Sequence, residues 1–77
     1  MEQRQNSQPQ AAKETFLRLL QQSPNSVGAF EGLTLSSLAL GQYREAEEWI
    51  ERWQVVSGSS PYVLGLKARA QSALRNE

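Results

Sequence analysis

The chain has 77 residues, with 8 Lys plus Arg against 8 Asp plus Glu, and it contains neither Cys nor His. This length allows one domain with a thin core. The formal net charge of zero argues against nucleic-acid binding, which needs an excess of positive charge. The lack of Cys excludes disulfides and thiolate zinc sites. No apolar run approaches the roughly 18 residues of a membrane span, so we expect no membrane insertion.

The N-terminal segment, residues 1–8, is polar and rich in Gln, Asn and Ser. We expect it to be disordered and to precede one helical domain over residues 9–75. The segment lacks the apolar stretch of a signal peptide, so none is expected. A cytoplasmic location is the expectation for the chain.

Apolar residues recur at helical spacing in four segments, which predicts an all-α fold without strands. The expected helices cover residues 9–22, 25–40, 42–56 and 61–74. Breaks are expected at Pro24, Gly41 and Gly58, with the main turn at Gly41-Gln42. Ser60-Pro61 is typical of an N-cap followed by a first-turn proline. The predicted core consists of Phe16, Phe30, Leu33, Ala46, Ile50 and Trp53.

A comparison of the chain with itself at an offset of 34 residues aligns the first helix with the third and the second with the fourth. The matching pairs include Ala12–Ala46, Phe16–Ile50, Phe30–Leu64 and Ala39–Ala73. The pairs that fail are Leu33–Lys67 and Leu35–Arg69. Because two short copies can also match by chance, the offset alone does not establish a repeat.

The chain has an aromatic residue, a leucine three residues later and a Gly-x-Tyr-x-x-Ala turn, here Phe30, Leu33, Gly41, Tyr43 and Ala46. In these residues it resembles the tetratricopeptide repeat. The resemblance covers roughly residues 9–75 and implies antiparallel helix pairs wound into a right-handed superhelix of about four helices.

The chain departs from the family pattern at several positions. Thr34 stands where the family prefers Gly or Ala, Ser37 where it prefers an aromatic residue, and Gly58 replaces the closing proline. A degenerate repeat, or a bundle of three to four helices with repeat-like spacing, therefore stays open as a second interpretation.

The resemblance also implies a concave face lined by the first helix of each unit. On this chain the implied protein-binding residues are Glu31, Leu35, Leu38, Tyr62 and Arg69. Repeats that clamp a terminal carboxylate place Lys and Asn where Glu31 and Leu35 stand, so that ligand is not expected. An apolar helix or an extended peptide with aliphatic anchors suits the face better. Equally open is the alternative that Leu35 and Leu38 are covered within the chain or by a second copy.

Two features that could suggest chemistry have simpler explanations. Glu45, Glu47, Glu48 and Glu51 cluster on one predicted helix, which is typical of a solvated face. The segment 57–60 lacks the pattern of a phosphate-binding loop and is interpreted as a linker. Since the usual general base and thiol nucleophile are absent, we expect no catalytic, metal or cofactor-binding residues, no cofactor and no enzyme activity.

The expected function is that of a non-catalytic protein–protein interaction module, an adaptor or chaperone-like protein that holds an apolar peptide or helix in a groove. The alternative is a self-associating structural bundle or part of a longer repeat scaffold. The expected partner is another protein or peptide, or a second copy of the chain. Trp53 is assigned to the core, whereas Trp49 lies at the edge of its stripe and suits either the core or a partner contact.

Overall fold

The computed structural model describes residues 2–76, with residues 2–8 described through their backbone. It contains four helices, α1 (Glu2–Gln22), α2 (Val27–Ala39), α3 (Tyr43–Ser57) and α4 (Pro61–Arg75). No strand occurs within residues 2–76. The predicted all-α fold of four helices is therefore confirmed.

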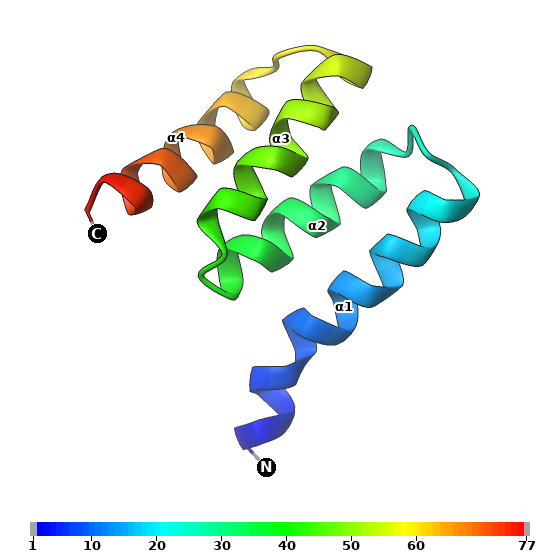
Figure 1. Ribbon diagram of the computed structural model, residues 1–77, viewed down its shortest axis with the longest axis vertical. Coiled ribbons are helices and arrows are strands. Elements are labelled where there is room, and N and C mark those ends of the chain that lie inside the picture. The colour runs from blue at the N-terminus through cyan, green and yellow to red at the C-terminus, as the bar shows by residue number, and fades with distance from the viewer. Residues whose placement is uncertain (1, 77) are drawn as a thin grey trace.

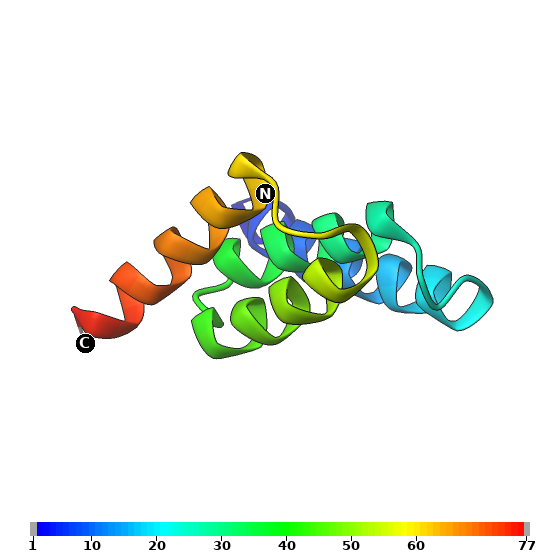
Figure 2. The same cartoon turned by 90° about the horizontal axis from the view of Figure 1, so that it is seen from above.

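The helices form a flat layer, with principal extents of 39 × 36 × 16 Å. Each helix packs on its neighbours in sequence, so the order across the layer is α1, α2, α3, α4 (Figure 1). Figure 2 shows the same layer from above, with α4 inclined to α3. Because α1 and α4 lie at the two edges, each of them leaves one side without a helical neighbour in the described part of the chain.

The ends of the helices follow the expected local chemistry. The Ser26 and Ser60 hydroxyls accept hydrogen bonds of 3.2 Å from backbone N–H groups three residues later, and so cap α2 and α4. Gly41 adopts a φ of 77°, and the Gln42 N–H beyond it donates to the Ser37 carbonyl at 2.8 Å. Gly58 ends α3 with a φ of 82°. The predicted breaks are confirmed, and apart from the start of α1 the helix boundaries differ from the predicted ones by at most two residues.

The first helix begins earlier than predicted. The sequence predicts a helix start at Pro9, whereas α1 begins at Glu2 and contains Pro9 in its interior. The disorder expected for residues 1–8 stays a prediction. Glu, Gln and Arg, which make up much of residues 2–8, favour helices. Pro9 itself opposes a continuous helix, because it removes one backbone hydrogen bond and its ring crowds the preceding turn. Met1 lies outside the described residues.

The core lies where α2 and α3 cross between the two outer helices. Five of the six predicted core residues are buried: Phe30, Leu33, Ala46, Ile50 and Trp53. The sixth, Phe16, is partly buried and packs against the same cluster. Side chains from the outer helices complete the core, namely Leu20 of α1 and Val63, Leu66 and Ala70 of α4.

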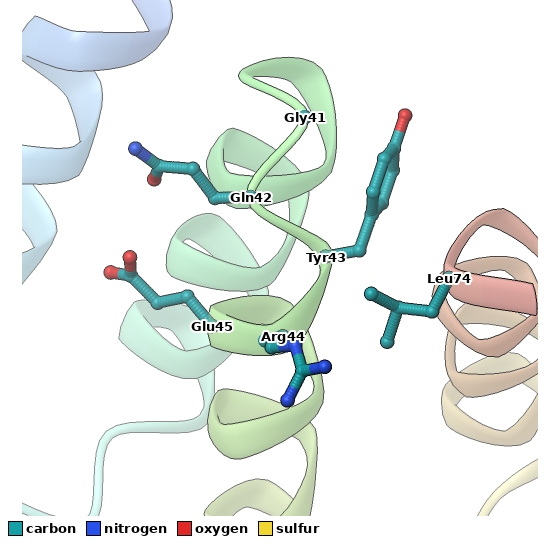
Figure 3. A pocket seen from close by; sticks show the side chains of 6 residues that line it. All are labelled: Gly41, Gln42, Tyr43, Arg44, Glu45 and Leu74. Atoms are coloured by element: carbon teal, nitrogen blue, oxygen red, sulfur yellow. The ribbon is translucent and has the colours of Figure 1, made fainter. Parts of the chain in front are cut away.

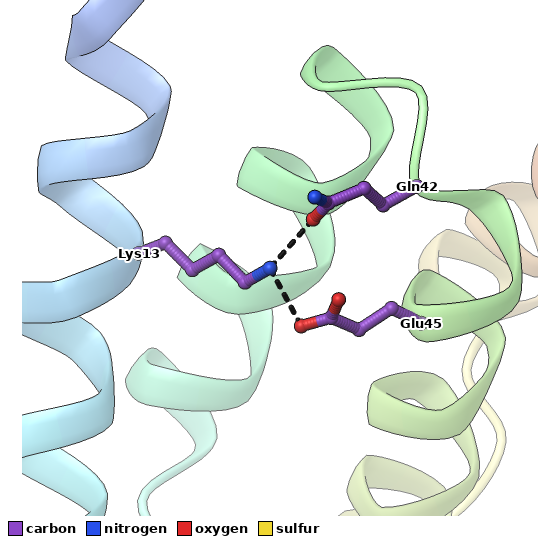
Figure 4. Close-up of polar contacts among 3 residues, drawn as sticks. All are labelled: Lys13, Gln42 and Glu45. Atoms are coloured by element: carbon purple, nitrogen blue, oxygen red, sulfur yellow. Dashed lines mark hydrogen bonds and ion pairs between the residues drawn. The ribbon is translucent and has the colours of Figure 1, made fainter.

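A polar contact ties α1 to the start of α3 across the end of α2. The Lys13 ammonium donates to the Gln42 side-chain oxygen at 2.5 Å and pairs with the Glu45 carboxylate at 2.7 Å (Figure 4). The Lys13 side chain is only 11% exposed. This partly shielded pair therefore holds the edge helix α1 in register with the central pair of helices.

Candidate protein-binding surface

The five predicted binding residues lie on two helices that are not adjacent in sequence. Glu31, Leu35 and Leu38 belong to α2, where the spacing i, i+4, i+7 puts them on one face. Tyr62 and Arg69 belong to α4 and are seven residues apart, which also places them on one face.

A side-chain hydrogen bond joins the two helices at this surface. The Tyr62 hydroxyl donates to the Glu31 carboxylate at 2.7 Å. The Tyr62 ring meets the buried Trp53 ring edge-on, with centroids 6.0 Å apart. The hydrogen bond to Glu31, with smaller contributions from burial and from the Glu31 charge, raises the pKa of Tyr62 above 10.0. The hydrogen bond at its hydroxyl and the ring contact with Trp53 thus fix the orientation of Tyr62, although its side chain is half exposed.

The two leucines have different environments. Leu35 is 40% exposed, whereas Leu38 is half-buried and packs against the core cluster. Groove residue and core residue were alternatives for both leucines on sequence alone. The structure separates the pair, with Leu35 on the surface and Leu38 at the border between surface and core.

Arg69 is exposed, and no hydrogen bond or ion pair among the described residues joins it to the other four. Val27, which the sequence analysis did not assign to the surface, is exposed and lies four residues before Glu31 on the same side of α2. That spacing is the signal that could have identified it. We use the name α2–α4 face for Val27, Glu31, Leu35, Leu38, Tyr62 and Arg69.

Trp49, for which the sequence allowed either a core position or a partner contact, is partly buried and packs against the core cluster. Its ring lies 6.5 Å from that of Phe30, and the Arg52 guanidinium covers both rings at 5.1 and 5.7 Å from their centroids. The Trp49 Nε1–H is buried without a hydrogen-bond partner among the described residues. This arrangement favours the core interpretation of Trp49.

Two pockets lie away from the α2–α4 face. One, of about 320 Å³, is formed by the start of α3 and the end of α4 (Figure 3). The lining residues of this pocket are Gly41, Gln42, Tyr43, Arg44, Glu45 and Leu74. The other, of about 190 Å³, lies beside the loop from α1 to α2. Its lining residues are Pro24, Asn25, Phe30, Arg52, Val55 and Val56. Neither pocket includes a predicted binding residue.

Chemical and membrane features of the described residues are few. Residues 9–76, whose side chains are described, hold no group of three or more His, Asp or Glu placed to bind a metal ion. In the same range, no helix combines the length and apolar character that crossing a bilayer requires. No protein-family model, no curated protein and no solved structure matches this chain.

Proposed function

We propose that this chain is a non-catalytic protein-interaction module that holds an apolar peptide or helix against the α2–α4 face. The observation that carries the proposal is the pairing of Leu35, 40% exposed, with Tyr62, 50% exposed, on two helices linked by the Tyr62–Glu31 hydrogen bond. Leu35 lies one helical turn after Glu31, the residue that holds Tyr62, so an aromatic and an aliphatic side chain are exposed on the same two linked helices. Aromatic and aliphatic side chains of this kind serve as anchors in protein interfaces.

The chemistry of the face suits an aliphatic segment. Val27 and Leu35 lie along α2 at one-turn intervals around Glu31, whose carboxylate already accepts a hydrogen bond from Tyr62. Arg69 adds one cation at the rim, where a carboxylate of the bound segment would pair with it. The absence of Cys and His from the sequence is in keeping with a binding role.

The proposal includes a tetratricopeptide-like arrangement. Sequential antiparallel helix pairs in an open layer are compatible with a right-handed superhelix, in which α2 and α4 would line the concave side. In this account the protein acts in the cytoplasm as an adaptor or chaperone-like module. The second candidate function is self-association, because the same exposed Leu35 and Tyr62 would serve a second copy of the chain equally well.

The test uses Leu35→Glu, with Val55→Glu as its matched control. Both substitutions add a carboxylate at an exposed aliphatic position, and Val55, 87% exposed, lies near the end of α3 rather than on the α2–α4 face. Leu38 is left unchanged because it contacts the core. The proposal predicts that Leu35→Glu loses the proteins that wild type recovers from cell extract, whereas Val55→Glu keeps them, with equal helix content by circular dichroism.

Solution mass distinguishes the two candidate functions. If wild type forms a dimer that Leu35→Glu dissociates, the face serves self-association. If Leu35→Glu recovers the same proteins as wild type, the α2–α4 face is not the binding surface and the proposal is wrong.

A further inference from the structure

The outer side of α4 corresponds to a side of α2 that is fully covered. At the offset of 34 residues, Phe30 and Thr34 of α2 correspond to Leu64 and Ala68 of α4. Phe30 is 1% exposed, while Leu64 is 49% exposed. Thr34 is buried, while Ala68 is exposed. The side that is buried in α2 is therefore exposed in α4.

The difference arises because α3 covers this side of α2, while the corresponding side of α4 lies at the edge of the layer (Figure 1). The α3 residue Trp49 packs against Phe30, with ring centroids 6.5 Å apart. On α4, the residues that face the core are Val63, Leu66 and Ala70. Leu64 and Ala68 point to the other side of the helix, where Gly65 also has open space beside it.

All charged side chains of α4 are positive. Residues 61–76 contain Lys67, Arg69 and Arg75 and no acidic residue, and Glu77 follows. Helix α3, which covers the equivalent side of α2, carries four glutamates and two arginines. The covering helix within this chain is therefore acidic, and the open helix is basic.

We propose that the outer side of α4, defined by Leu64, Lys67, Ala68, Gln71 and Arg75, binds an acidic amphipathic helix of a partner protein, placed as α3 is placed on α2. Leu64 is smaller than Phe30, and Ala68 is smaller than Thr34. The partner helix therefore presents a bulky apolar side chain to Leu64, with carboxylates flanking it toward Lys67 and Arg75.

Charge also disfavours a second copy as the occupant. Two α4 helices packed against each other would bring Lys67 and Arg75 of both copies together without acidic partners. Helix α1 of a second copy offers no net negative charge either, because its exposed described side chains Glu14 and Arg18 balance and Lys13 is already paired with Glu45. A separate acidic helix supplies the negative charge that neither edge helix has. This surface differs from the α2–α4 face, so each proposal can fail without the other.

A defined peptide library tests the inference. Displayed helical peptides of about four turns carry fixed apolar residues at i, i+3 and i+4 spacing, with flanking positions randomised among Asp, Glu, Lys and Arg. Selection uses the intact wild-type chain. The expected winners have a net negative charge, and their binding, measured by fluorescence anisotropy, weakens as salt is raised. Leu64→Glu should weaken them at least about tenfold, since it places a carboxylate against the apolar side chain of the peptide and repels the flanking carboxylates.

Leu35→Glu and Val55→Glu serve as controls and should bind the selected peptides as wild type does. Circular dichroism checks that Leu64→Glu, a change at an exposed position, folds normally. The inference is overturned if no peptide is enriched, if the winners are neutral or basic, or if Leu64→Glu binds them unchanged. It is also overturned if Leu35→Glu alone abolishes binding, which would place the peptides on the α2–α4 face. A wild-type dimer that Leu64→Glu dissociates would make a second copy the occupant and would overturn it as well.

Discussion

The ring of Phe16 on α1 occupies the space that a side chain at Gly32 of α2 would need. A Cβ atom at residue 32 would overlap the Cδ2, Cε2 and Cζ carbons of that ring. Glycine is unfavourable in the interior of a helix, yet Gly32 lies inside α2, where it is buried. The close approach of α1 to α2, and with it the attachment of the edge helix, therefore depends on this pair.

Gly32→Ala should destabilise the domain by about 1–3 kcal/mol, because the added methyl group displaces Phe16 and outweighs the gain in helix propensity. Gly65→Ala is the matched control. It lies inside a helix with nothing within 4 Å of the new Cβ, so it should stabilise by up to about 1 kcal/mol. Denaturant titration of both variants checks this. Equal effects at the two positions would show that the ring does not restrict residue 32.

Trp53→Ala should cost about 3–5 kcal/mol, because Trp53 is almost fully buried and supports the Tyr62 ring. That is a large share of the total stability of a domain this small, of the order of 5 kcal/mol. The measurement is the free energy of unfolding by denaturant titration. Val55→Ala, at an exposed position, should change it by less than about 0.5 kcal/mol. A loss below about 1 kcal/mol in Trp53→Ala would mean that the indole is peripheral.

Ser37→Ala should leave stability unchanged or raise it by up to about 1 kcal/mol. The Ser37 hydroxyl is fully buried and has no hydrogen-bond partner among the described residues, so its removal relieves a desolvation cost. Alanine also has the higher helix propensity. Thermal unfolding followed by circular dichroism gives the comparison. A clear loss of stability would show that the hydroxyl has a partner after all.

The Tyr62–Glu31 hydrogen bond predicts a pH dependence with a definite sign. Because the pKa of Tyr62 is raised above 10.0 in the folded protein, the bond stabilises the fold below pH 10.0 and this contribution is lost as pH rises through the folded value. A spectroscopic tyrosinate titration should give a lower midpoint for Tyr62 in Glu31→Gln than in wild type. Tyr62→Phe identifies which of the two tyrosine transitions belongs to Tyr62. Identical midpoints in wild type and Glu31→Gln would contradict the contact.

Local signals in the sequence account for most of the fold. The serine caps, the turn at Gly41 and the apolar stripe through Ala46, Ile50 and Trp53 each depend on neighbours within a few residues, so they were predictable. The early start of α1 was not, since the sequence offers no strong signal before Pro9. Periodicity also could not separate Leu35 from Leu38, because burial there depends on how the neighbouring helices cross.

The departures from the repeat pattern have a physical counterpart in the structure. Thr34 and Ser37, the unusual residues of α2, are two of the buried groups that lack a hydrogen-bond partner among the described residues. Leu33 is buried between helices, whereas Lys67, which fails to match it, is half-buried on the edge helix α4. The match between residues 34 apart is therefore poorer in α4, because α4 lies at the edge of the layer and has no covering helix on its outer side in the described part of the chain.

The measurement that tests the interaction proposal most directly is a quantitative comparison of the proteins recovered from cell extract by wild type, Leu35→Glu and Val55→Glu, with circular dichroism and solution mass on the same samples. The account predicts a set of proteins that wild type and Val55→Glu retain and that Leu35→Glu loses, with all three chains equally helical and monomeric. Recovery of the same proteins by all three chains, or no specific recovery by a monomeric wild type, would contradict it.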